Sequence, residues 1–428
     1  MKKLLTAVLI AAIGIGSIFA NGQNEKTSQT DSKVTIKVAN YALLENGYEE
    51  YWKGIKTGFE TENPNITIEW VTAPYGEISN QVINMAGGGD KVDCIFAELG
   101  WIPGFEDAGL AAPVEDILPQ EFIDDFYPDV MKSFEIDGVA YGIPLYVSPY
   151  VLYYNRTLFE QAGLDPNTPP TTYEEMLEDA KSLSKLKDSN GNPVYAFGQT
   201  TASVPVSGSS IQGMIFNFGG HTLAADGSLD CDNQGFYDAF RMLKELDEKG
   251  YNPQNAKLKD LRNLFALGQL AMYYDQSWGF NGIQSINPDA KSFIASAAPL
   301  KGGNGNGQSK LESHCFVLVD NGEARADATS KFVQYVISEK GLSDYLANLT
   351  PAYPARKSMA DISGVVNNPV LKGASGSVSN VTASPAIAQL NDLNLELCSL
   401  AQAVTVGNED VDAAIADFKK VTNAKLSD

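Results

Sequence analysis

Histidine is scarce in this sequence, which excludes several catalytic arrangements. There are two histidines in 428 residues, His221 and His314, and neither accompanies a serine or cysteine in a pattern typical of a nucleophile and its base. The segment 208–210 is not a G-x-S-x-G elbow. The glycine-rich segment 301–307 lacks the GK[ST] ending of a phosphate-binding loop, so we expect neither a serine hydrolase nor a nucleotide-binding protein.

Basic residues are also in the minority. The chain has 31 Lys and Arg against 53 Asp and Glu, a formal net charge of −22. This excess argues against nucleic acid and anionic membrane surfaces as partners, and it suits a neutral or cationic ligand better than a polyanion. With 44% hydrophobic and 20% charged residues, the composition is that of a soluble globular protein, and the length indicates two or three domains.

Long apolar runs are missing except at the N-terminus. Lys2 and Lys3 precede an apolar-biased run, residues 4–19, and Ala20 offers a small residue for cleavage. Because this run is shorter than the ~20 residues of a membrane span, residues 1–20 are predicted to be a secretory signal, with a retained anchor as the alternative. No cysteine lies near Ala20 for lipid attachment. Residues 21–32 are predicted to be a flexible tether, and the mature chain is expected in the periplasm or outside the cell.

Cysteine shows no metal-binding pattern. Cys94, Cys231, Cys315 and Cys398 form no C-x-x-C pair and have no histidine cluster beside them, so we expect no metal site. Cys94 and Cys315 lie in apolar, strand-like runs, where a buried thiol is the usual arrangement. Export would also permit disulfides, and the sequence leaves both possibilities open.

The hydrophobic pattern that is present predicts an α/β fold. Residues 34–38, 66–70 and 92–97 read as strands with amphipathic helices between them. This alternation predicts a mainly parallel sheet with helices on both faces. A second set of elements follows, and a late strand at 315–319 indicates that the chain returns to the first body.

The stretch 138–186 is predicted to connect the two bodies. It contains Pro144 and Pro149, and proline cannot donate to a ladder. We therefore predict a crossing followed by a strand at 150–154, not one long central strand. A capping-box pattern, Thr172-x-x-Glu175, predicts the start of a helix. Beyond this stretch, the Ser- and Gly-rich segment 203–213 is interpreted as a loop.

Aromatic residues beside carboxylates and amides are the most informative chemical pattern. Sugars stack their apolar ring faces on Trp or Tyr, while planar polar side chains exchange hydrogen bonds with the hydroxyls. The stretches with this mixture are residues 75–77, 98–101, 141–150 and 273–278. Trp101 and Trp278 each follow a predicted strand end, where open α/β sheets bind ligands. Core packing is the alternative interpretation of any single stretch.

Several short motifs occur in the order of a known family. They are FETENPNI at 59–66, DCIF at 93–96 followed by Gly109-Leu110, DGVAYGIP at 137–144 with YYN at 153–155, FALGQLAM at 265–272 with Trp278, and TPAYPAR at 350–356. In this order they resemble the sugar-binding family of bacterial extracellular solute-binding proteins, the maltose-binding-protein-like components of ATP-driven (ABC) uptake systems.

The resemblance implies an α/β, two-lobed periplasmic-binding-protein fold, with mixed, mainly parallel sheets joined by a three-segment hinge. The crossings are expected near residues 146–149, 298–301 and 350–354. The implied lobes are residues 33–146 plus 302–350 and residues 147–301 plus 351–428. A monomeric binding protein is implied, not an enzyme, without cofactor or metal.

The implied function is capture of a carbohydrate between the lobes and its delivery to the membrane permease of an ABC transporter. Trp101 and Trp278 would stack on the sugar, and carboxylates and hydroxyls near them would bind its hydroxyl groups. The full set of expected ligand-binding residues is Trp278, Trp101, Glu98, Glu77, Tyr75, Tyr41, Asp275, Ser148, Tyr146 and Tyr353.

Two other functions stay open. Asn394, Leu395 and Cys398 stand where the maltose-binding pattern has aromatic and Arg contacts, so maltose is not the expected ligand. Glycerol-3-phosphate or a polyol would suit the same scaffold, but a phosphate needs a basic residue in the cleft, for which Arg356 is the obvious candidate. An exported glycosidase would need a positioned carboxylate pair, and none stands out among 53 acidic residues.

Overall fold

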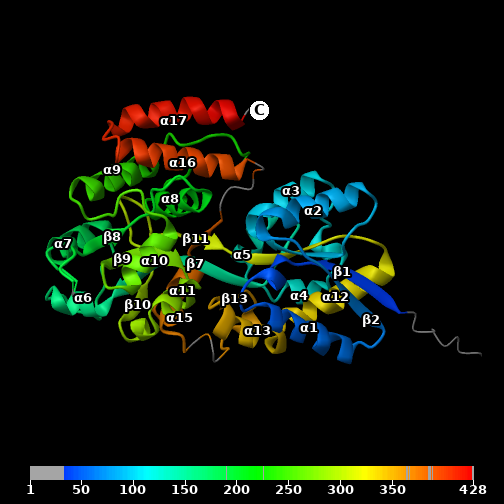
Figure 1. Cartoon of the computed structure of the whole chain (residues 1–428). Coiled ribbons are helices and arrows are strands. Elements are labelled where there is room, and N and C mark those ends of the chain that lie inside the picture. Colours follow the sequence, from blue (N-terminus) through cyan, green and yellow to red (C-terminus); the bar gives the residue numbers. More distant parts are fainter. Residues whose placement is uncertain are drawn as a thin grey trace, which may run out of the picture.

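The structure is a computed structural model that describes residues 33–426 except positions 189, 225, 363–364, 366, 384–386 and 388. The predicted signal peptide and tether, residues 1–32, lie outside the described residues. Figure 1 shows the chain as two lobes side by side, each with helices packed around strands. Within the described ranges, no helix is long and apolar enough to cross a bilayer.

The first lobe is built on a sheet whose order, in the described part of the chain, is β2-β1-β3-β12-β6. β1 pairs in parallel with β2 and β3, as the sequence predicts, and β12 pairs antiparallel with β3 and β6. Its strands are β1 (Val34–Ala39), β2 (Ile66–Val71), β3 (Cys94–Glu98), β6 (Ile143–Pro144) and β12 (His314–Leu318), with a hairpin of β4 (Glu135–Ile136) and β5 (Val139–Ala140). Its helices are η1 (Tyr41–Leu44), α1 (Glu49–Glu62), α2 (Tyr75–Gly87), η2 (Leu99–Trp101), α3 (Ile102–Asp107), η3 (Val114–Asp116), α4 (Gln120–Ile123), α5 (Pro128–Lys132), α12 (Glu323–Val336), α13 (Glu339–Asp344), η5 (Tyr345–Leu349) and η6 (Lys357–Met359).

Burial explains why these segments form helices and strands. α1 buries Trp52, Ile55 and Phe59, which recur at helical spacing along one face. β1 buries Ile36 and Val38, which alternate along the strand. These side chains share one core between sheet and helix. Burying a side chain of this size contributes about 1.5–3 kcal/mol.

The second lobe is built on a sheet whose path, among the described residues, is β14-β11-β7-β9-β8, with β10 and β13 also paired to β7. Its strands are β7 (Tyr146–Asn155), β8 (Tyr195–Gly198), β9 (Leu270–Gln276), β10 (Ile294–Ala297), β11 (Ser309–Glu312), β13 (Tyr353–Pro354) and β14 (Val381–Thr382). Its helices are α6 (Arg156–Gln161), α7 (Tyr173–Leu183), α8 (Pro205–Asn217), α9 (Gln234–Glu248), α10 (Leu258–Ala266), α11 (Gly279–Ile286), η4 (Pro288–Ser292), α15 (Pro369–Gly373), η7 (Ser375–Ser379), α16 (Leu390–Val404) and α17 (Val411–Leu426). The predicted start of α7 is confirmed, because the Thr172 hydroxyl accepts a hydrogen bond from the Glu175 N–H at 3.1 Å.

β7 is one continuous buried strand of ten residues, which corrects the prediction of a crossing followed by a short strand at 150–154. Tyr146 and Val147 pair with β13, whereas the pairing with β9 begins at Tyr150. Pro149 therefore lies where one neighbouring strand gives way to the next. Pro149 itself pairs with Leu311 of β11 and lies outside the range that pairs with β9, so its missing N–H removes no ladder bond to β9.

The chain passes from β6 of the first sheet to β7 of the second at Leu145, close to the expected crossing, but another crossing lies elsewhere than expected. β11 belongs to the second sheet and β12 to the first, so one crossing falls at Ser313 and not near residues 298–301. After β13 the chain still packs on the first lobe, because Met359 and Ile362 lie in its core, and α15 then contacts β10. The exact division of the chain into two lobes therefore stays a prediction.

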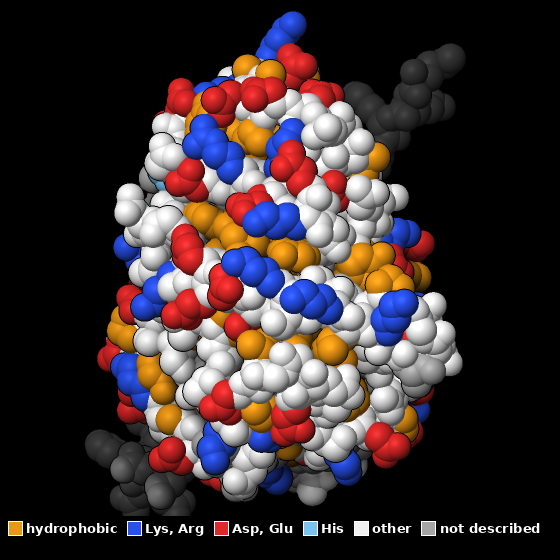
Figure 2. Space-filling model, turned by 90° about the vertical axis from the view of Figure 1, so that its left-hand side faces the viewer, with side chains coloured by type: hydrophobic (Ala, Val, Ile, Leu, Met, Phe, Trp, Pro, Cys, Tyr) orange, Lys and Arg blue, Asp and Glu red, His pale blue; other side chains and the backbone are white. Residues whose placement is uncertain are grey.

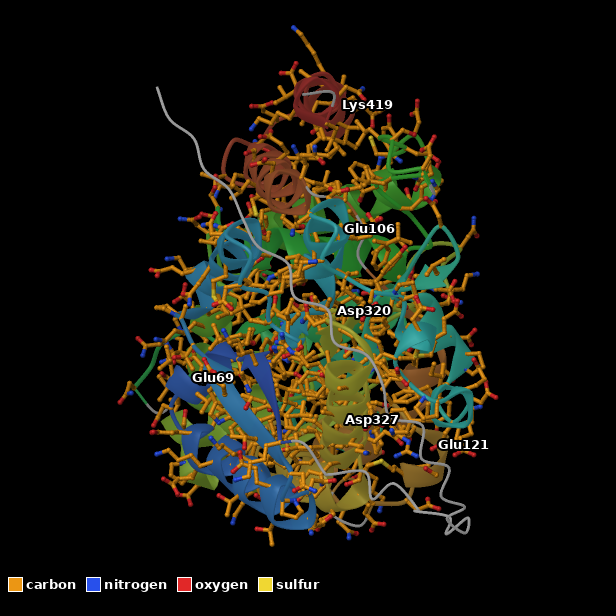
Figure 3. All side chains as sticks on the ribbon, turned by 90° about the vertical axis from the view of Figure 1, so that its right-hand side faces the viewer. Glu69, Glu106, Glu121, Asp320, Asp327 and Lys419 are labelled. Carbon is orange, nitrogen blue, oxygen red and sulfur yellow. The ribbon has the colours of Figure 1, made fainter. Side chains whose placement is uncertain are left out.

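Charge is spread over both lobes. Figure 2 looks onto the second lobe, where basic and acidic side chains alternate with small apolar patches. Figure 3 looks onto the first lobe, where Glu69, Glu106, Glu121, Asp320 and Asp327 stand on separate segments. Part of the acidic excess is therefore distributed over this surface, which favours solubility.

Candidate ligand-binding cleft

A cleft of about 520 Å³ lies where strand ends of the two lobes face each other. One wall comes from α2, the end of β3 and α3, and the opposite wall comes from α8, the end of β9, β11 and α16. This volume falls within the ~300–1,000 Å³ of small-molecule sites. Of the ten residues expected from the sequence, those that line the cleft are Tyr75, Glu98, Trp101 and Trp278.

The first-lobe wall joins aromatic rings to a carboxylate. The Tyr75 hydroxyl donates a hydrogen bond to Glu98 Oε2 at 2.8 Å. The rings of Tyr75 and Trp101 lie 5.3 Å apart, between their centroids. Glu98 is the last residue of β3 and Trp101 ends the short η2 helix after it, so the strand end places both side chains on this wall.

A layer of aromatic rings around His314, which itself lines the cleft, supports this wall. His314, the first residue of β12, accepts or donates at both ring nitrogens: Nε2 lies 2.5 Å from the Tyr41 hydroxyl, and Nδ1 bonds the Tyr146 hydroxyl. The His314 ring stacks on Phe96 with centroids 4.9 Å apart. Burial lowers the pKa of His314 to about 3, so this imidazole is neutral. Tyr41 and Tyr146, expected as ligand contacts, instead hold this layer in place.

Trp278 and Gln276 form part of the second-lobe wall at the end of β9. The Trp278 ring lies 6.0 Å from the Tyr146 ring and 6.2 Å from His314. The Gln276 amide donates to the Tyr150 hydroxyl at 3.0 Å and accepts from Arg262 at 3.2 Å. These contacts orient Gln276 where it borders the cleft.

Charged side chains on β11 line the cleft and were missed from the sequence. Lys310 and Glu312 form an ion pair, and the Ser209 hydroxyl of α8 donates to Glu312 Oε1 at 2.9 Å. Lys310 is only 2% exposed. Lys310 and Glu312 are two positions apart on a strand, so their side chains share one face of the sheet. This spacing would have identified them as a pair if the strand had been recognised in the sequence.

Helices α8 and α16 complete the second-lobe wall. The Gln212 amide donates to Asn394 Oδ1 at 2.6 Å, joining the two helices. Asn391 and Asn394 border the cleft from α16. The prediction of a loop at 203–213 is wrong, because α8 runs from Pro205 to Asn217. Its small residues serve close packing, since Gly208 lies directly against the backbone of Asn394.

Glu98 has an unusual electrostatic environment. Desolvation, followed by the like charge of Glu312, raises the pKa of Glu98 to about 7. The Tyr75 hydrogen bond and the charge of Lys310 act in the opposite direction. Near neutral pH this carboxyl group therefore exists in both protonation states.

Three of the expected ligand contacts have buried side chains that do not line the cleft. Asp275 is fully buried and accepts hydrogen bonds from Arg262 Nε at 2.5 Å and Nη2 at 2.7 Å. Ser148 is also fully buried, with its hydroxyl 2.6 Å from that of Ser277. The Tyr353 hydroxyl donates to the Leu371 carbonyl. All three stabilise the strands behind the cleft.

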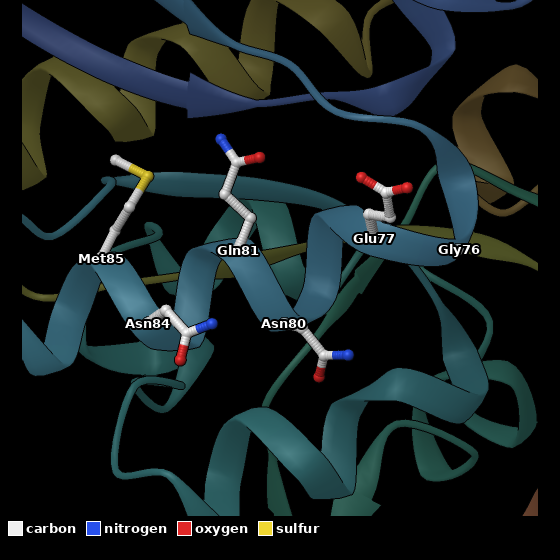
Figure 4. A pocket seen from close by; sticks show the side chains of 6 residues that line it. All are labelled: Gly76, Glu77, Asn80, Gln81, Asn84 and Met85. Atoms are coloured by element: carbon white, nitrogen blue, oxygen red, sulfur yellow. The ribbon is translucent and has the colours of Figure 1, made fainter.

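Glu77 lies on α2 outside the cleft. It borders a separate hollow of about 550 Å³ with Asn80, Gln81, Asn84 and Met85. Figure 4 shows that Glu77, Gln81 and Met85 project from one side of α2, whereas Asn80 and Asn84 project from the other. Glu77 therefore does not line the cleft, and its role in ligand binding stays a prediction.

The structure also shows the state of the four cysteines and whether the described side chains could hold a metal ion. All four cysteines are buried free thiols, as the apolar runs around Cys94 and Cys315 predict. Burial raises the pKa of Cys94 and of Cys315, so both stay protonated. In the ranges that the structure describes, no group of three or more His, Cys, Asp or Glu side chains could hold a metal ion.

Comparison with known proteins identifies the family of this chain. Residues 55–373 match the model of the bacterial extracellular solute-binding protein family. The chain belongs to this family. A binding protein of Brucella abortus (strain 2308) is 23% identical over 403 residues, covering 94% of this chain and 95% of the relative. The solute-binding family thus confirms the resemblance seen in the sequence motifs.

Solved structures share the two-lobed fold. The cyclic alpha-maltosyl-1,6-maltose binding protein of Arthrobacter globiformis superimposes with a TM-score of 0.80 at 21% identity, covering 92% of this chain and 99% of that protein. UgpB of Mycobacterium tuberculosis, solved in complex with glycerophosphocholine, gives a TM-score of 0.75 at 19% identity, covering 92% and 98%. The fold is therefore confirmed, and because these two ligands differ, the cleft must indicate the ligand class.

Proposed function

We propose that this solute-binding protein captures a carbohydrate in the cleft and delivers it to the membrane permease of an ABC transporter. The observation that carries the proposal is that both walls of the cleft combine aromatic rings with polar groups. Tyr75, Trp101 and Glu98 line the first-lobe wall, and Trp278 and Gln276 line the second-lobe wall. Aromatic faces stack on sugar rings, and carboxylates and amides exchange hydrogen bonds with hydroxyls. The maltose-type ligand of the Arthrobacter relative agrees with this chemistry.

The mechanism is closure of the lobes around the ligand. A sugar that touches both walls favours the closed state by its greater affinity for that state. The moving parts would meet at the crossing points, on β7, at Ser313 and at β13. Hinges need only a few residues that absorb the change in backbone angles.

A phosphate-bearing ligand fits the cleft less well. Among the described residues that line it, Lys310 is the one Lys or Arg, and it is 2% exposed and paired with Glu312. Arg356, the candidate from the sequence, donates to Asp125 at 2.8 Å and does not line the cleft. An anionic group would meet uncompensated carboxylates, so glycerol-3-phosphate is the weaker alternative.

The proposal has three further parts. The chain would work as a monomer, would be exported by the signal at residues 1–20, and would not catalyse a reaction. The extracellular description of the family supports the location. Sustained turnover of a chromogenic glycoside by the purified protein would contradict the non-catalytic role and favour an exported glycosidase.

The experiment that tests the function is a thermal-shift screen of sugars, polyols and glycerol phosphates, followed by calorimetry on the best ligand. Replacing Trp278 or Trp101 by Ala should weaken binding by about 1–3 kcal/mol, the contribution of one large apolar side chain. Tyr237→Ala is the matched control, because Tyr237 lies on α9 and contacts Lys419 and Asp232 outside the cleft. Unchanged affinity in both Trp variants would contradict the site.

A further inference from the structure

The charges that line the cleft are unbalanced. Glu98, Glu135 and Glu312 contribute carboxylates, and Lys310 contributes the one ammonium group among the described lining residues. Lys310 is already paired with Glu312. Glu98 therefore borders the cleft, with its side chain 37% exposed, without a permanently charged basic partner.

The surroundings of Glu98 supply neutral groups and a like charge. Tyr75 donates a hydrogen bond from α2, and the ring of Trp101 lies beside Tyr75. His314 Nε2 is 3.8 Å from Glu98 Oε1, but this imidazole is neutral because burial lowers its pKa to about 3. Glu312, from the opposite lobe, repels the charge of Glu98.

We propose that the carbohydrate carries a cationic nitrogen, the free amino group of a hexosamine unit, and that Glu98 is its counter-ion in the cleft. This inference rests on the proposed carbohydrate-binding function. An ammonium group would form a charge-assisted hydrogen bond with the carboxylate, which is about twice as strong as a neutral one. The faces of Tyr75 and Trp101 would add a cation–π attraction. The strongly negative chain would also attract such a ligand from solution.

The proposal predicts a specific pH dependence. A bound ammonium group favours the carboxylate form of Glu98, so binding lowers the pKa of Glu98 from about 7 in the free protein. Affinity for the amino sugar should therefore rise as the pH rises from about 6 to about 7.5, and fall again when the ligand amine loses its proton. A neutral sugar, whose hydroxyl groups bind a carboxylate more weakly than an ammonium group does, should show a smaller rise, and it has no amine proton whose loss would cause the later fall.

The other titratable groups around Glu98 do not produce this profile. They are Tyr41, Tyr75, Cys315, His314, Glu312 and Lys310. Desolvation raises the pKa of Tyr41, Tyr75 and Cys315 and lowers that of His314 to about 3, so these four groups keep one protonation state between pH 6 and 7.5. Glu312 and Lys310 form their own ion pair.

The test is calorimetry of the purified protein with matched sugars that differ only at the nitrogen. The probes are glucosamine, galactosamine and chitosan oligosaccharides, each compared with its N-acetyl form and its hydroxyl counterpart. At pH 7.5 the amine should bind roughly 10- to 100-fold more tightly, the effect of one hydrogen bond to a charged group. Glu98→Gln should abolish this preference. Glu69→Gln, an exposed carboxylate on β2, is the matched control and should keep it.

The outcomes separate this inference from the proposed function. If acetylated or hydroxyl sugars bind as tightly as the amines at pH 7.5, or if Glu98→Gln keeps the preference, the amino-sugar inference is overturned while carbohydrate binding stands. If no sugar of any kind binds saturably, the proposed function itself fails, and this inference fails with it. The pH profile of the wild-type protein needs no variant, so it decides the matter even if Glu98→Gln folds poorly.

Discussion

The role of a carboxylate depends on the groups that surround it, as a comparison of Asp275 and Glu98 shows. Both lie at the ends of strands, Asp275 in β9 and Glu98 in β3, and the sequence predicts both as sugar contacts. Asp275 is fully buried and receives two guanidinium hydrogen bonds from Arg262 and one from the Tyr273 hydroxyl at 3.0 Å. Its charge is therefore satisfied inside the protein. Glu98 has no such cation and borders the cleft.

Replacing Arg262 by Met should destabilise the fold strongly. The change leaves Asp275 buried without its cation, which costs about 3–5 kcal/mol in the free energy of unfolding. Urea unfolding followed by circular dichroism measures this loss. Arg241→Met is the control, because Arg241 pairs with Asp238 and Asp412 on the surface and should change stability by less than about 1 kcal/mol. Equal effects of the two changes would argue against a structural role for the Arg262–Asp275 pair.

At the scale of elements, the contact between α8 and α16 shapes the second-lobe wall. Both helices carry cleft-lining residues, including Ser209 and Asn394. A Cβ atom on Gly208 would lie 2.1 Å from the Asn394 carbonyl oxygen, so the helices approach closely because this position is glycine. The wall therefore depends on a residue that does not itself line the cleft.

Gly208→Ala should push the two helices apart and reduce the free energy of unfolding by about 1–3 kcal/mol, the usual cost of overpacking. Gly213→Ala, in the same helix, is the control, since its Cβ would meet Lys310 at an ordinary 3.5 Å. Without a clash, Ala in a helix gains about 0.5–1 kcal/mol over Gly. Thermal unfolding of the two variants compares them, and a Gly208 variant as stable as the Gly213 variant would contradict the close approach.

At the scale of the whole molecule, the lobes are joined by short segments with ladder contacts of their own. β7 pairs with strands of the second sheet and with β13, and Ser313 separates β11 from β12. The Ser313 hydroxyl donates to the Tyr146 carbonyl at 2.6 Å, which ties two of these segments together. Such an arrangement allows the lobes to rotate while each core stays intact.

Ligand binding should therefore compact the protein. Saturation with the cognate sugar is expected to lower the radius of gyration measured by small-angle X-ray scattering. It should also raise the melting temperature, with about 2.7 kcal/mol of added stability at a ligand concentration of about 100 Kd. Trp278→Ala should require a higher ligand concentration for the same compaction. A rise in melting temperature without any change in size would contradict closure.

Much of the fold and part of the cleft could be predicted from local patterns. The parallel pairing of β1 with β2 and β3, the start of α7 at Thr172 and the buried Cys94 and Cys315 follow from short-range periodicity. The errors have non-local causes. Pro149 is tolerated because the strands beside β7 change there, and the small residues of α8 serve packing against α16.

By itself, the sequence determined the family, the order of most strands and helices, and the placement of Trp101 and Trp278 at strand ends. These features depend on residues close together in the chain. Only the tertiary structure decided which polar groups border the cleft, because that depends on distant partners. Arg262 turns Asp275 into a structural residue, whereas β11 brings Glu312 close enough to influence Glu98 across the two lobes. A carboxylate thus holds a strand in one place and borders the cleft in the other, according to whether a cation lies within reach.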